Sequence, residues 1–172
     1  TSEERLLLHL LENPLREGQW DVGAEITQAG IAIATHVQRK HVPRTIKQAI
    51  NRELVFDDTR HIIGARQRRR VYGLTFSGRD MANSLRSRLI EMEVSSEEGV
   101  KPLSAYIPEH GSLLLALSHI GDDCSWNETP LVENKSDAEA KGHIDLNMKD
   151  RLIRSVLTQA WKDGFLSSDE QA

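Results

Sequence analysis

The interval between apolar residues changes twice in the middle of the chain, and few folds accommodate such a change. A helical interval comes first, at Val42, Ile46, Ala49 and Ile50. The interval then shortens towards that of a strand on both sides of Gly64–Arg70, where the β-branched residues include Val55, Ile62, Ile63 and Val71. A helical interval returns at Met81, Leu85 and Leu89. This order predicts a helix, a two-stranded hairpin with a basic tip, and another helix.

Two further helices are predicted before this region. Thr1 and Glu4 have the spacing of a capping box, and the leucines that follow recur at helical intervals until Asn13 and Pro14 end the helix. Thr27 is a suitable N-cap for a second, short helix that ends at residue 35.

Ser77 is expected to be the N-cap of the helix after the hairpin, with Asp80 at the third position. In the strand before it, Tyr72, Leu74 and Phe76 are expected to point inward. The complete order up to residue 90 is therefore three helices, a hairpin and a fourth helix.

Positive charge is concentrated in residues 36–70. This stretch has 10 Arg or Lys residues and 3 Asp or Glu residues, a net charge of +7 in a chain whose net charge is -4. Such a cluster is typical of a surface that binds a phosphate backbone, because counterion release supplies much of the affinity. The alternative is a basic face that contacts only solvent.

The two halves of the chain differ in charge. Residues 1–90 hold 15 Arg or Lys against 10 Asp or Glu, whereas residues 91–172 hold 7 against 16. This asymmetry predicts two domains with different partners, a basic domain over 1–90 and an acidic, α-rich region over 91–172.

Within the acidic region, the sequence predicts a hairpin around Glu97–Gly99 and a helix after Pro108. An amphipathic helix is predicted to begin after Asp145. Because the sequence predicts that another helix begins just before Ala172, we expect the chain to be part of a longer protein.

Two segments resemble the winged helix-turn-helix family of DNA-binding regulators. Residues 72–85, YGLTFSGRDMANSL, are similar to the Tyr-x-Leu-Thr-x-x-Gly pattern that closes the wing and starts the next helix in many members. Residues 41–55, HVPRTIKQAINRELV, are similar to the recognition helix and its exit into the wing. The basic tip GARQRRR resembles the wings of archaeal-type members joined to longer signalling or repeat-containing chains.

The resemblance covers about the first 90 residues. It implies an α+β fold that is mainly α: a winged helix-turn-helix of three helices, a two-stranded wing and a following helix, with a smaller, mostly helical C-terminal region. Two positions depart from the family pattern. Gln38 stands where the family usually has a small hydroxyl cap, and Pro43 lies inside the recognition helix, which predicts that regular helix begins near Lys40.

The function that the resemblance implies is duplex-DNA binding by a transcriptional regulator. The third helix would enter the major groove, and the wing would lie over the adjacent backbone or minor groove. The DNA-binding residues would be Arg39, Lys40, His41, Arg44, Lys47, Gln48, Arg66, Arg68, Arg69 and Arg70. Arg and Lys side chains can contact guanine or phosphate, and Gln can contact adenine.

Other functions are compatible with the same sequence. Winged helices also serve as protein-protein interaction modules, and the acidic region is suited to a protein partner, to a homodimer contact, or to covering the basic face. The chain could equally be the N-terminal part of a larger multidomain signalling ATPase. An enzyme is not expected within this chain, because it has no phosphate-binding glycine loop with lysine, no Gly-x-Ser-x-Gly motif and no histidine-glutamate metal motif.

The seven histidines and the single cysteine do not form a metal-ligand pattern. His119 and Cys124 could meet across the end of a helix, but no third or fourth ligand accompanies them. We therefore expect no metal and no cofactor. The single cysteine, the lack of a signal-like segment and the lack of an apolar run long enough to span a bilayer favour a cytoplasmic location away from membranes.

Overall fold

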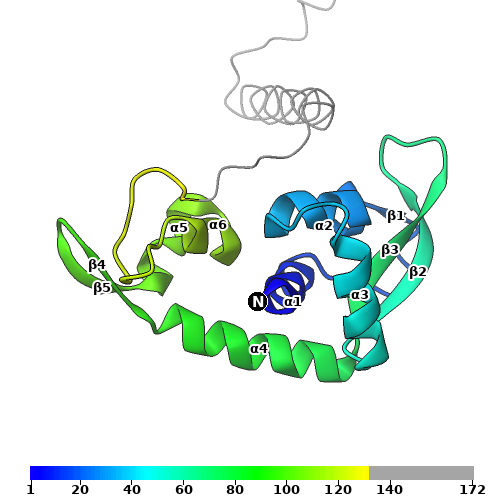
Figure 1. The fold of residues 1–172 in the computed structure, drawn as a ribbon. Helices are drawn as coiled ribbons and strands as arrows, with labels where there is room; N and C mark the ends of the chain where they lie inside the picture. The colour runs from blue at the N-terminus through cyan, green and yellow to red at the C-terminus, as the bar shows by residue number, and fades with distance from the viewer. Residues whose placement is uncertain (132–172) are drawn as a thin grey trace, which may run out of the picture. The chain divides into compact units, whose positions relative to one another are not determined.

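The computed structural model describes residues 1–131 of the chain (Figure 1). These residues belong to one compact unit, Thr1–Asn134. The fold is of the α+β class, as the sequence predicts, and more of its residues lie in helices than in strands. The amphipathic helix predicted after Asp145 and the helix predicted near Ala172 lie outside the described residues.

The first helix, α1 (Ser2–Glu12), begins at the predicted capping box. The Thr1 hydroxyl accepts a hydrogen bond from the Glu4 backbone N–H at 3.2 Å, and the Glu4 carboxylate accepts one from the Thr1 amino group at 2.6 Å. These bonds satisfy N–H groups that have no partner within the helix.

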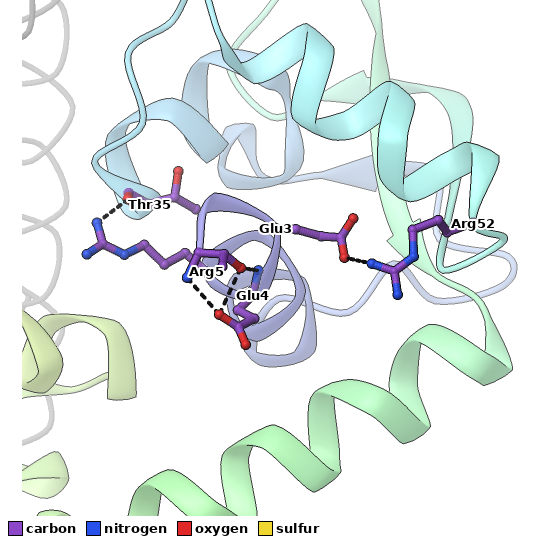
Figure 2. A network of polar contacts seen from close by, with 6 residues as sticks. Glu3, Glu4, Arg5, Thr35 and Arg52 are labelled. Carbon is purple, nitrogen blue, oxygen red and sulfur yellow. Dashed lines mark hydrogen bonds and ion pairs between the residues drawn. The ribbon is translucent and has the colours of Figure 1, made fainter.

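Side chains of α1 connect it to two other helices, as Figure 2 shows. The Arg5 guanidinium donates a hydrogen bond of 3.3 Å to the Thr35 carbonyl, at the end of α2 (Gln28–Thr35). Glu3 forms an ion pair with Arg52, which follows α3 (Val42–Asn51). The N-cap of α2 is Thr27, as predicted, because its hydroxyl accepts from the N–H of Gly30 at 3.3 Å.

The predicted apolar stripe of α3 is confirmed. Val42, Ile46 and Ala49 are buried, and Ile50 is half-buried. The helix begins at Val42, so the start predicted near Lys40 is two residues too early. Pro43 consequently lies in the first turn, where its missing N–H would have had no helical partner.

The predicted hairpin is confirmed as β2 (Val55–Ile62) and β3 (Arg68–Leu74), which pair in antiparallel fashion. Its turn is shorter than predicted, because Arg68, Arg69 and Arg70 are paired residues of β3. Asp57 and Asp58 lie in β2. Their carboxylates pair with wing arginines, and this explains why acidic residues occur in this strand.

A third strand, β1 (Asp21–Val22), pairs with β2 in parallel, with Asp21 opposite His61 and Val22 opposite Ile62. The sheet order is therefore β1-β2-β3. A 3-10 turn, Ala24–Ile26, follows β1 and leads into α2.

The long helix α4 (Phe76–Ile90) begins two residues earlier than predicted. Its N-cap is Thr75 and not Ser77, since the Thr75 hydroxyl accepts from the Gly78 N–H at 3.0 Å and donates to the Glu53 carbonyl at 2.6 Å. Phe76 is therefore the first helical residue and is 84% exposed, which contradicts its expected inward position.

The buried side of α4 is formed by Ala82 and Leu85, with Leu89 half-buried. Met81, which the helical interval places on this side, is exposed. The difference arises because the helix packs against α1 along a face centred on Ala82, whose side chain is fully buried.

Residues 91–131, here called the acidic lobe, contain the predicted second hairpin, β4 (Glu93–Ser96) and β5 (Gly99–Pro102). A 3-10 turn, Leu103–Ala105, and two short helices, α5 (Ile107–His110) and α6 (Leu113–Ser118), follow it.

Two hydrophobic clusters stabilise this unit, and α1 contributes to both. Leu6, Leu7 and Leu10 belong to the cluster beneath α2, α3 and the sheet. Leu8 belongs to the second cluster, together with Leu85 of α4 and buried residues of the acidic lobe. The division into domains near residue 90 stays a prediction, although α1 and α4 join the two sides of that boundary.

Candidate nucleic-acid interface

All ten residues predicted to bind DNA have exposed side chains, and they fall into two groups. The first group lies on and just before α3 and consists of Arg39, Lys40, His41, Arg44, Lys47 and Gln48. The second group lies on the wing, the hairpin of β2 and β3, and consists of Arg66, Arg68, Arg69 and Arg70.

The buried stripe of α3 determines which of its side chains face outward. Arg44, Lys47 and Gln48 lie on the side opposite the stripe, because residues of a helix that are two or five positions from a buried residue point away from it. This exposed helix face carries two cations and an amide, which are groups that contact phosphates and base edges.

The start of α3 adds further positive potential. His41 occupies the N-cap position, and no side chain caps the first turn. The amino-terminal end of a helix carries a partial positive charge, and its unpaired N–H groups can donate to an anion. Arg39 and Lys40 immediately precede this end, so charge and dipole reinforce each other.

On the wing, strand pairing determines the direction of each arginine. Arg68 lies opposite His61, Arg69 opposite Arg60, and Arg70 opposite Thr59. Since successive residues of a strand point to opposite faces, Arg68 and Arg70 share one face and Arg69 lies on the other.

Some of the positive charge of residues 36–70 is neutralised within the chain. Arg60 pairs with Asp58 at 2.7 Å, and Arg70 pairs with Asp57 at 3.3 Å. The Thr59 backbone N–H, followed by Arg60, lowers the pKa of the Asp58 carboxyl, so this carboxylate stays charged near neutral pH.

Seven cations of this stretch form no ion pair with any other part of residues 1–131. They are Arg39, Lys40, Arg44, Lys47, Arg66, Arg68 and Arg69. An exposed cation without an acidic neighbour keeps its full attraction for a polyanion. The candidate interface is therefore strongest on α3 and along the wing positions that lack acidic partners.

The wing is also attached to the loop before α2, which was not foreseen from the sequence. The Arg60 guanidinium donates to the Gln19 carbonyl at 3.2 Å, and the His61 ring contacts the Asp21 carboxylate at 2.8 Å. These contacts fix the backbone on both sides of Trp20, whose side chain is 73% exposed. Periodicity cannot detect a strand of two residues, so the sequence did not predict β1. The isolated tryptophan in a polar loop was the one sequence signal that marked this loop as a candidate contact site.

The acidic lobe has the opposite electrostatic character. Residues 91–131 hold eight Asp or Glu residues and a single basic residue, Lys101. All eight acidic side chains are exposed: Glu91, Glu93, Glu97, Glu98, Glu109, Asp122, Asp123 and Glu128. Only Glu98 among them forms an ion pair within the described part of the chain, with Lys101 at 2.6 Å.

The side chain of His119 in the acidic lobe is engaged by its neighbours. His119 stacks on Trp126 with ring centroids 5.0 Å apart and donates through Nδ1 to the Asn127 carbonyl at 2.8 Å. Within residues 1–131, no three His, Cys, Asp or Glu side chains are grouped closely enough to hold a metal ion. None of the helices in this same range is both long and apolar enough to cross a membrane.

The chain matches no protein-family model, and no curated protein or solved structure shows significant similarity to it. The resemblance to winged helix-turn-helix proteins therefore rests on the sequence segments alone, and the DNA-binding role of the ten residues stays a prediction.

Proposed function

We propose that this chain is a duplex-DNA-binding protein of the winged helix-turn-helix type that acts as a transcriptional regulator. The observation that carries the proposal is the set of exposed, unneutralised cations on α3 and the wing, in a chain that is acidic elsewhere. The arrangement of α2, α3 and the β2–β3 hairpin is consistent with this fold type (Figure 1).

In the proposed complex, α3 lies in the major groove. Arg44, Lys47 and Gln48 would face the base edges, where arginine or lysine contacts guanine and glutamine contacts adenine. The uncapped start of α3, with Arg39 and Lys40, would contact a phosphate. The helix is thus the proposed source of specificity.

The wing is the proposed source of non-specific affinity. Arg66, Arg68 and Arg69 have no acidic partner within the described residues, so each can displace a counterion from the phosphate backbone. Arg70 would contribute less, because Asp57 already lies 3.3 Å from its guanidinium.

The acidic lobe would restrict how DNA approaches. Its exposed carboxylates repel phosphates, while the basic surface attracts them. Because the lobe packs on α1 and α4, its negative charge is held by the same hydrophobic unit that presents α3 and the wing.

Salt-dependent binding provides the test. Fluorescence anisotropy with labelled duplex DNA of random sequence would give the dissociation constant at several salt concentrations. Replacing Arg68, Arg69 and Arg70 with alanine should weaken binding to all sequences and reduce the log-log salt slope by about 1 for each lost phosphate contact.

A matched control removes the same charge elsewhere. Arg79, Arg86 and Arg88 are three exposed arginines of α4, and their joint replacement with alanine should leave the slope close to that of the unmodified protein. Equal slopes for the two triple variants would contradict the proposed role of the wing. Absence of duplex binding at low salt would contradict DNA binding altogether.

The second candidate function is a protein-interaction module. The eight exposed carboxylates of the acidic lobe favour it, because a surface of this charge is complementary to a basic protein. A chain that fails to bind duplex DNA at low salt but binds a basic protein partner would support this function instead.

A further inference from the structure

We propose that the edge of the wing around Trp20, Arg60 and Arg69 binds an unpaired nucleotide beside the duplex. The inference rests on the proposed DNA-binding function and adds a preference for DNA that carries single-stranded or unpaired bases. Trp20 would stack on the base, and Arg69 would contact its phosphate.

Trp20 is an exposed aromatic side chain on an immobilised backbone. The preceding carbonyl, of Gln19, accepts a hydrogen bond from Arg60, and the following residue, Asp21, contacts His61. The Ile63 N–H donates to the Val22 carbonyl at 3.0 Å, which extends the pairing of β1 with β2. A tryptophan side chain has only two torsions. On a fixed backbone it therefore loses little conformational entropy when it binds a ligand.

The position of Trp20 next to an arginine pair indicates the kind of ligand. Arg60 and Arg69 lie directly opposite each other on β2 and β3, and like charges at such positions repel. Asp58 neutralises Arg60, whereas Arg69 has no acidic partner within residues 1–131. Arg69 is therefore available to a phosphate, and an aromatic ring beside a phosphate site is suited to a nucleobase.

A fully paired duplex cannot satisfy such a site, because its bases are stacked on one another and their faces are covered. An overhang, a bulge or a frayed end exposes the face of a base. Stacking of one base on an aromatic side chain strengthens binding by about 5-fold or more. The site therefore predicts tighter binding to a duplex with unpaired bases than to a blunt duplex.

Three labelled DNAs would test this prediction by fluorescence anisotropy with the full chain: a blunt duplex, the same duplex with a short single-stranded overhang, and the duplex with an abasic overhang. The abasic overhang carries the same phosphates but no bases. We expect the base-containing overhang to raise affinity by about 5-fold over the abasic one.

The Trp20→Ala variant should lose this difference and keep its affinity for the blunt duplex, whereas Trp20→Phe should retain part of it. Phe76→Ala serves as the matched control, because Phe76 is also a highly exposed aromatic residue but lies on α4. Equal affinities for the base-containing and abasic overhangs, or a loss of the difference in Phe76→Ala as well, would overturn the inference while leaving duplex binding intact. Failure to bind any of the three DNAs would overturn the proposed function and this inference together.

Discussion

The carboxylate of Glu12 accepts a hydrogen bond of 2.8 Å from the backbone N–H of Leu113, a residue 101 positions further along the chain. Glu12 ends α1, and Leu113 begins α6. The contact satisfies one of the free N–H groups at the start of α6. The Ser112 hydroxyl satisfies a second one, because it accepts a hydrogen bond from the Leu115 N–H. A helix of only six residues depends on such contacts, because isolated short helices are unstable in water.

Replacing Glu12 with alanine is expected to lower the free energy of unfolding by about 1 kcal/mol, the usual effect of losing a helix cap. Urea denaturation would measure the change. Glu12→Gln should lose less, since an amide oxygen can still accept the bond, and Glu17→Ala provides a control at an exposed position of the following loop. An equal loss in the alanine variants of Glu12 and Glu17 would show that the bond does not stabilise the protein.

Replacing Asp57 with asparagine is expected to strengthen DNA binding. The change removes a negative charge from the wing and frees Arg70 to contact a phosphate. The log-log salt slope should become steeper by about 1. Asp80→Asn removes an exposed carboxylate from α4 and should change neither quantity. Unchanged or weaker binding by the Asp57 variant would argue against phosphate contact at this part of the wing.

The stability of the fold is expected to decrease as the pH falls below 6.5, because of His9. This side chain is buried, and burial lowers its pKa below the ordinary value of 6.5, although a hydrogen bond of 2.8 Å to the Glu25 carbonyl opposes the shift. Below pH 6.5 the unfolded chain therefore binds a proton that the folded chain does not, and the free energy of unfolding decreases until the lowered pKa is reached.

Urea denaturation between about pH 7 and about pH 5 would measure this decrease, above the range in which carboxylates titrate. The variant His9→Gln should be less stable at neutral pH but should show a smaller pH dependence in this range. An identical pH dependence in the variant would assign the effect to another group.

Replacing Gly78 with alanine is expected to lower the free energy of unfolding by about 2 kcal/mol or more, as overpacking does in a core. A Cβ atom at this position would lie 1.8 Å from the Leu54 carbonyl oxygen, so α4 and the start of β2 would have to separate. Asn83→Ala, on the exposed side of the same helix, should change stability by less than about 0.5 kcal/mol. Thermal and urea denaturation of the two variants would compare them, and similar losses would contradict the steric argument.

Local signals predicted most of the helices correctly. The capping box at Thr1 and Glu4, the N-cap at Thr27 and the apolar stripe of α3 depend on residues close in sequence, and the structure confirms each of them. The two hairpins were also predicted, because their strand intervals and turn residues are local.

The start of α4 could not be chosen from local signals alone. Thr75 and Ser77 are both suitable caps, and the close approach of Gly78 to Leu54 selects Thr75. A residue that is distant in sequence therefore decided between two equivalent local signals.

The candidate interface was predicted in composition but not in its ion pairs. Which arginines are neutralised depends on the register of β2 against β3, and the sequence does not specify that register at single-residue resolution. The attachment of the wing through Arg60 and the loop before α2 depends on a strand of two residues, which periodicity cannot detect.

The position of α1 between two hydrophobic clusters determines where this chain can be shortened. A chain that ended at residue 90 would uncover Leu8 and Leu85 and would leave the Glu12 carboxylate without Leu113. Such a fragment would tend to aggregate through its newly exposed leucines, and a fragment ending at residue 131 would keep both clusters intact. The negatively charged lobe is thus part of the smallest piece that should fold, and it would accompany the basic surface in any fusion or transplanted domain.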